Sequence, residues 1–205
     1  MSTPSLLWHP VTWVFVSMAV LGGLTAEILT SHEGPVGVAP TDYGAVPEFS
    51  LVDQDNKPVT DADLRGHAWV GDFIFTSCPD ACPALTATMG GVLPRISDPG
   101  VRLVSFSVDP ETDTPERMAT WSAQFHPPPG RWSFLTGNKD AVKAALTGFK
   151  VAADRVAGPD GNTSLVHSET FLLVDPNGHL RGYYGVDKAG LDALVADVAI
   201  VSAGR

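Results

Sequence analysis

The sequence predicts an α/β domain in which helices flank a mixed central β-sheet. Short apolar runs of strand length alternate along the chain with segments whose apolar residues recur every three or four positions, the period of a helix face. Helices that cross between strands imply that part of the sheet is parallel, and a hairpin near the C-terminus implies an antiparallel edge. The expected order is therefore β, β, α, β, α, β, α, a β-hairpin and a final α.

The first two strands lead up to the two cysteines of the chain. Residues 48–52 (EFSLV) alternate as a strand does, and turn-forming residues follow at 53–57. Residues 68–76 (AWVGDFIFT) form a dense apolar run, typical of a central strand. A helix is expected directly after the cysteines, weakened toward its end by two glycines and a proline. Its apolar face carries Leu85, Met89, Val92 and Ile96.

Two further strands are expected in the middle of the chain, and a helix is expected after each of them. Residues 102–108 (RLVSFSV) and 132–135 are predicted to be strands. Between them, Asp113 or Thr114 is predicted to cap a helix that has Pro115 in its first turn. The apolar stripes are Met118, Trp121 and Phe125 in this helix, and Val142, Ala145, Leu146 and Phe149 in a later helix capped by Asn138.

The C-terminal part is predicted to contain a hairpin and a last helix. Residues 150–166 show no regular pattern and are expected to be irregular. Residues 169–175 and 179–184 flank a Pro-Asn-Gly turn, whose Asn and Gly tolerate positive φ, so the two strands should pair antiparallel. Residues 188–202 should form the last helix, with an apolar stripe of Leu191, Leu194, Val195 and Val198.

The N-terminal segment predicts a membrane anchor. Residues 10–26 are uncharged and mostly apolar, and with the residues before them they reach about 20 residues, the span of a bilayer core. We expect an uncleaved transmembrane anchor over residues 1–29, rather than a signal peptide or a buried helix, because no Ala-x-Ala cleavage site follows. A flexible Gly- and Pro-rich linker is expected over 30–46, followed by the folded domain at 47–205. Without an Arg-rich transit peptide, we expect a bacterial inner-membrane protein whose domain lies in the periplasm.

The charge of the chain excludes one class of partner. There are 13 Lys and Arg residues against 23 Asp and Glu residues, which gives a net charge of −10. No basic stripe is present to neutralise a phosphate backbone, so we expect no nucleic-acid binding.

Cys78 and Cys82 are expected where the apolar strand ends and the next helix begins. A helix N-terminus favours the thiolate, and a four-residue interval puts both sulfurs on one helix face, one turn apart. Soft thiolates favour Cu(I) or Zn, but two sulfurs are too few for a closed site, so a third ligand is required. His167 precedes the strand 169–175, which would bring it to the same end of the sheet. The other histidines are most simply surface residues: His9, His32, His67, His126 and His179.

Three segments resemble, in order and spacing, the signatures of the Sco (SenC) family of copper chaperones: FTSCPDACP, SFSVDPETDTPERM and LVHSETFLLVDPNG. The resemblance covers the chain from about Pro47 onward. It implies a thioredoxin-like fold and a copper ion bound by Cys78, Cys82 and His167. It also implies delivery of that copper to the binuclear copper site of cytochrome c oxidase, or to another periplasmic copper protein. Many members have Asp directly before this histidine, where this chain has Val166; if that acid orients the ring, its loss weakens copper binding.

The cysteine pair leaves a second interpretation open, in which the chain is a thiol:disulfide oxidoreductase. Cys78 and Cys82 would then be the redox-active pair, cycling between dithiol and disulfide to keep acceptor cysteines reduced. A general thioredoxin role is disfavoured because no Pro stands directly before Glu169, and a peroxidase role because Thr76 is only two residues before Cys78. A merely structural disulfide is also disfavoured, since closing a short loop gives little entropic stabilisation.

Three acidic residues within the second signature segment can be read as ligands of a hard metal ion. Asp109, Glu111 and Asp113 are spaced two residues apart. Asp-Pro turns and helix capping explain these residues without any ion, and we interpret them as structural.

Overall fold

The computed structural model describes residues 38–79, 81–150, 154–157, 163–166 and 169–204. Residues Ala39–Arg205 form one compact unit. The predicted anchor at residues 1–29 and residues 30–37 of the predicted linker lie outside the described residues. Among the helices that are described, none combines the length and the apolar character needed to cross a bilayer.

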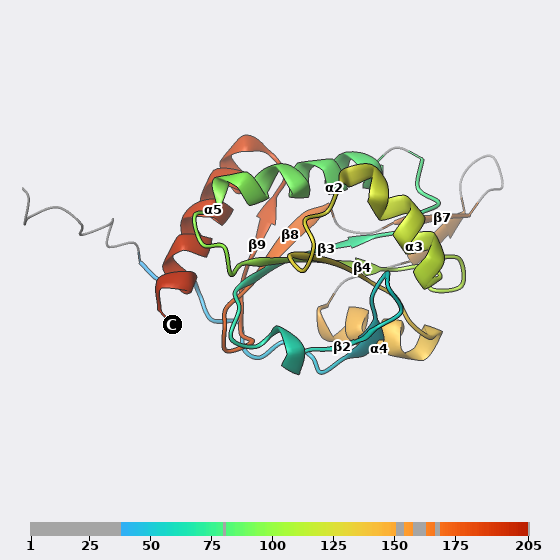
Figure 1. Ribbon diagram of the computed structural model, residues 1–205, viewed down its shortest axis with the longest axis horizontal. Helices are drawn as coiled ribbons and strands as arrows, with labels where there is room; N and C mark the ends of the chain where they lie inside the picture. The colour runs from blue at the N-terminus through green and yellow to red at the C-terminus, as the bar shows by residue number, and fades with distance from the viewer. Residues whose placement is uncertain (1–37, 80, 151–153, 158–162, 167–168, 205) are drawn as a thin grey trace, which may run out of the picture. The chain divides into compact units, whose positions relative to one another are not determined.

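A five-stranded mixed sheet forms the centre of the domain, in the order β5-β4-β3-β8-β9 (Figure 1). β3 (Trp69–Ile74), β4 (Arg102–Ser107) and β5 (Trp132–Leu135) run parallel, with Trp69 opposite Arg102. β8 (Thr170–Val174) pairs antiparallel with β3 and with β9 (Leu180–Gly185). All six residues of β3 are buried, as expected of the central strand of a sheet covered on both faces. The predicted mixed sheet is therefore confirmed.

Helices cover both faces of the sheet (Figure 1). α2 (Ala81–Val92), α3 (Pro115–Ser122) and α5 (Lys188–Ala203) lie on one face, and α4 (Lys139–Gly148) lies on the other. The predicted caps Thr114 and Asn138 are confirmed, because the side chain of each accepts a hydrogen bond from a backbone N–H of the helix that follows. Asp187, which was not predicted as a cap, does the same for α5. Short 3₁₀ helices are η1 (Ala62–Leu64), η2 (Leu93–Arg95) and η3 (Ala123–Phe125).

An aromatic cluster fills the core on the α4 face of the sheet. Phe106 of β4 stacks on Phe73 of β3, with ring centroids 5.5 Å apart. Its ring also lies 5.3 Å from Phe149 and 5.4 Å from Phe49. The opposite face of β3 and β4 carries smaller and more polar side chains, and α2 packs against it.

The structure contains three short strands that were not predicted from the sequence. The stretch expected to be irregular contains β6 (Asp154–Ala157) and β7 (Thr163–Val166), which pair antiparallel. β2 (Pro58–Thr60) pairs with the predicted first strand, β1 (Ser50–Val52). These strands have three or four residues each and no apolar run, so their sequences lack the alternation that identifies a strand.

Backbone pairing extends the domain toward the N-terminus. The N–H of Tyr43 donates to the carbonyl of Leu180, and the N–H of Leu180 donates to the carbonyl of Gly44, both at 2.9 Å. The N–H of Val46 donates to the carbonyl of Gly178, also at 2.9 Å. Residues that the sequence placed in the linker thus lie against the β8–β9 hairpin, and the folded part starts before Pro47.

Candidate metal centre

The two cysteines lie at the junction between β3 and α2, as predicted. Cys78 follows the end of β3 and is partly exposed, whereas Cys82 lies in the first turn of α2 and is completely buried. No disulfide joins these two residues. The backbone N–H of Cys82 donates to the sulfur of Cys78 at 3.3 Å, so the two residues are held next to each other. A partly exposed sulfur beside a buried one is an arrangement suited to binding a soft ion or to thiol exchange.

Burial has the largest effect on the pKa of the Cys82 thiol. The loss of solvation raises the pKa of Cys82 well above that of an ordinary thiol. The sequence predicted that the helix N-terminus would favour a thiolate here, but at Cys82 burial outweighs that effect. Cys82 is therefore a neutral thiol at neutral pH until a metal ion or an exchange reaction removes its proton.

A buried carboxyl group lies on the same strand that leads to the cysteines. Asp72 is completely buried, and neither of its carboxyl oxygens has a hydrogen-bond partner among the described residues. Burial raises the pKa of Asp72 to about 7, and the ionised carboxylate in turn raises the pKa of Cys82. Asp72 was not predicted as a site residue; its signal in the sequence is that of a single acidic residue inside the apolar run AWVGDFIFT.

The three acidic residues of the second signature segment have structural partners. Glu111 forms an ion pair with Lys139 at 2.8 Å, and the backbone carbonyl of Asp109 accepts from the N–H of Asp113 at 2.9 Å. Asp113 does not cap α3 with its side chain, a role that belongs to Thr114. The Asp113 carboxylate instead points inward, where it accepts a hydrogen bond from the Ser107 hydroxyl at 2.7 Å.

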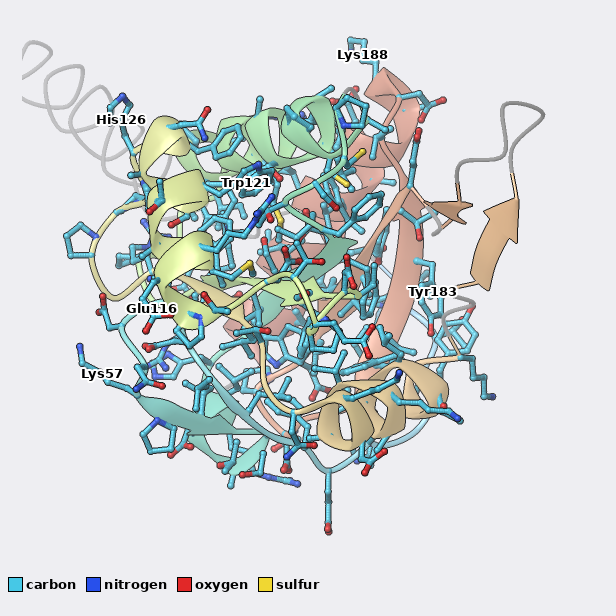
Figure 2. All side chains as sticks on the ribbon, turned by 90° about the vertical axis from the view of Figure 1, so that its right-hand side faces the viewer. Lys57, Glu116, Trp121, His126, Tyr183 and Lys188 are labelled. Carbon is cyan, nitrogen blue, oxygen red and sulfur yellow. The ribbon has the colours of Figure 1, made fainter. Side chains whose placement is uncertain are left out.

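The contacts given for the described histidines, His67, His126 and His179, do not include either cysteine. His67 Nδ1 lies 3.0 Å from the carbonyl of Gly100, and His179 Nδ1 lies 2.8 Å from the carboxylate of Asp42. His126 ends η3 with a φ of 49° and points outward in Figure 2, which views the molecule from the right-hand side of Figure 1. Within the described residues, no three His, Cys, Asp or Glu side chains form a group that could hold a metal ion.

The predicted third ligand, His167, lies outside the described residues, as do His9 and His32. β8 runs antiparallel to β3, so its first residue, Thr170, lies at the end of β3 that leads to Cys78. His167 precedes Thr170 by three residues in the sequence.

Comparison with known proteins identifies a family. A family model described as SCO1/SenC matches residues 39–201. The SCO1 protein homolog of Bacillus subtilis is 34% identical over 194 residues, covering 90% of this chain and 98% of the relative. A protein of Stutzerimonas stutzeri described as a putative copper-binding protein is 31% identical over 142 residues, covering 68% of each chain.

Solved structures give the same result. The structure of Bradyrhizobium japonicum ScoI with copper bound matches with a TM-score of 0.67 and 29% identity, covering 77% of this chain and 99% of that one. A structure of BsSco, described as a Sco family cytochrome c oxidase assembly protein with a disulfide switch, matches with a TM-score of 0.68 and 32% identity. It covers 82% of this chain and 99% of that one.

Proposed function

The chain belongs to the SCO1/SenC family, and from that premise we propose that it binds copper and passes it to another protein outside the cytoplasm. The proposed ligands are Cys78, Cys82 and His167. The proposed acceptor is the binuclear copper site of cytochrome c oxidase, and the proposed location is the bacterial inner membrane, with residues 1–29 as the anchor and the domain in the periplasm.

The observation that carries the proposal is the contact between the two cysteines. The hydrogen bond from the N–H of Cys82 to the sulfur of Cys78 keeps both thiols within reach of one ion. Thiolates are soft ligands that favour Cu(I) or Zn, and the resemblance to the family points to copper. The partial exposure of Cys78 gives an entry point, which suits a protein that must also release its copper.

His167 is the proposed third ligand for two reasons. The resemblance to the family assigns copper binding to this histidine, and in the sequence it stands three residues before Thr170, the first residue of β8, a strand that pairs antiparallel with β3. Cu(I) sites with two thiolates accept an imidazole as a further ligand, because imidazole is a borderline-soft donor.

Cys78→Ser should abolish stoichiometric copper binding. A serine hydroxyl is a hard, neutral donor at neutral pH and does not replace a thiolate for Cu(I). The measurement is an anaerobic copper titration of the reduced protein, for which we expect one copper per wild-type chain. Ser77→Ala is the matched control, because it changes the adjacent exposed residue and keeps both thiols. Unchanged stoichiometry in Cys78→Ser would refute the proposed site.

His167→Ala should lower copper affinity at least about tenfold while both thiols remain titratable, since it removes a ligand and not merely a group that orients one. The measurement is competition with a Cu(I) chelator, together with a thiol count on the same sample. His126→Asn is the matched control, because it also removes an imidazole and asparagine tolerates positive φ. Equal affinities of His167→Ala and the wild type would exclude His167 as a ligand.

One observation also favours the second candidate, a thiol:disulfide oxidoreductase. An accessible Cys78 beside a buried Cys82 gives one sulfur that an acceptor disulfide meets first and one that resolves the mixed disulfide. The pair would be oxidised to a disulfide while the acceptor disulfide is reduced to two thiols. The midpoint potential of the pair discriminates the two functions, since a reductant of acceptor cysteines must have a potential below that of its acceptor.

A further inference from the structure

Asp113 lies at the centre of a buried hydrogen-bond network that includes Thr76, two residues before Cys78. Its side chain is fully buried. Its carboxylate accepts hydrogen bonds from both the hydroxyl and the backbone N–H of Thr76, the latter at 3.2 Å, and from the hydroxyl of Ser107 at 2.7 Å. The backbone carbonyl of Asp113 accepts a further bond from the hydroxyl of Thr136 at 2.6 Å.

These partners belong to three neighbouring strands. Thr76 follows β3, Ser107 ends β4 and Thr136 follows β5, so a single residue joins the carboxyl ends of all three parallel strands. In an α/β sheet this edge is where functional groups gather. Asp113 is thus placed to fix the relative positions of the segments that leave the sheet at the candidate site.

The connection from Asp113 to the thiols passes through Thr76. Thr76 stands two residues before Cys78, and its hydroxyl also accepts a hydrogen bond from Arg117 Nε at 2.6 Å. The backbone turns immediately afterwards, where the N–H of Cys78 donates to the carbonyl of Phe75 at 3.2 Å. Hydrogen bonds that involve a charged partner are stronger than neutral ones, so the Asp113 and Arg117 contacts hold Thr76 firmly.

Burying a carboxylate costs desolvation free energy, so a buried carboxylate contributes little to the stability of a fold. Burial raises the pKa of Asp113, which shows that its charged form is penalised. An apolar side chain of the same size often stabilises a core as well as a buried ionic group does. What the carboxylate provides, and an apolar side chain does not, is a fixed geometry for the donors that converge on it.

We propose that Asp113 is a positioning residue that sets, through Thr76, the distance between the sulfurs of Cys78 and Cys82. The inference builds on the proposed function, because it assumes that this pair of thiols is the working site. Loosening Thr76 lets the turn at Cys78 move away from α2. The sulfurs then spend less time within bonding distance, for a disulfide or for a shared ion.

The test uses thiol–disulfide equilibrium in the copper-free, full-length protein. In a glutathione buffer, Cys78 and Cys82 are oxidised to a disulfide while glutathione disulfide is reduced to two glutathione molecules, which take up the two protons. Asp113→Asn and Thr76→Val should each lower the ratio of disulfide to dithiol about tenfold at fixed poise, equivalent to about 30 mV. Thr76→Ser keeps the hydroxyl and should restore the wild-type ratio.

Asn138→Ala separates positioning from general stability. It removes the N-cap of α4, on the opposite face of the sheet, and such a loss lowers the stability of a protein. We expect it to lower stability and leave the disulfide ratio unchanged. An unchanged ratio in both Asp113→Asn and Thr76→Val, or no rescue by Thr76→Ser, would overturn the inference. Because no copper is present, this result is distinct from a failure of wild-type protein to bind copper, which would refute the proposed function.

Discussion

The copper affinity of the protein should rise at least about tenfold for each unit of pH between about pH 6 and pH 8. Copper binds the thiolate, and burial keeps the pKa of Cys82 well above its ordinary value, so Cys82 is protonated throughout this range. Each binding event must therefore release the proton of Cys82. Lower pH supplies the competing proton and weakens binding, and higher pH removes it.

The measurement is a competition with a Cu(I) chelator of known pH dependence, repeated across this range. Proton release on copper addition, followed in weakly buffered solution, gives an independent count. Cys82→Ser lacks a proposed ligand, so copper addition to this variant should release no protons through stoichiometric binding. An affinity that stays constant with pH would mean that the inner thiol is already ionised, contrary to the effect of its burial.

The sequence predicted the large elements of the fold because each has a strong local signal. β3 lies in a continuous apolar run, and the helices α3 and α4 follow the predicted caps Thr114 and Asn138, whose side chains bond to the first turn. α5 carries an apolar stripe at helical spacing. β6 and β7 were not predicted, because a four-residue strand with polar residues forms through pairing with its partner strand and has no recognisable pattern of its own.

The candidate site was predictable only in part. Cys78 and Cys82 were found because strand and helix signals place them at one junction. The role of Asp113 was not, since Asp113 and Thr114 are equally good caps by sequence, and only the fold brings Thr76 to Asp113 across 37 residues. The protonation of Cys82 also depends on burial, which is a property of the folded chain and not of local sequence.

Asp72→Asn should change the pH dependence of stability more than any other single substitution of an acidic residue considered above. The pKa of Asp72 is about 7 in the folded protein, against 3.8 for an ordinary aspartate. Below about pH 4 both the folded and the unfolded chain hold the proton, so the carboxyl costs nothing. Between about pH 4 and pH 7 the unfolded chain releases the proton while the folded one keeps it, so the free energy of unfolding falls. Above about pH 7 both states are ionised and the penalty is constant.

Asparagine stays neutral at every pH, so the free energy of unfolding of Asp72→Asn relative to the wild type should rise from pH 4 to pH 7 and then level off. At about 1.4 kcal/mol per pKa unit, the full rise is of the order of 4 kcal/mol. Urea unfolding at pH 4.5, 6 and 8 measures this rise. The change with pH is a better test than the free energy of unfolding at a single pH, because the asparagine amide has N–H donors that a carboxylate lacks. Asp192→Asn is the opposite control: contacts with Lys188 and Arg95 lower the pKa of this exposed carboxyl, so its loss should not stabilise the protein as pH rises. Parallel stability profiles for Asp72→Asn and the wild type would show that Asp72 is not buried as a carboxyl group beneath α2.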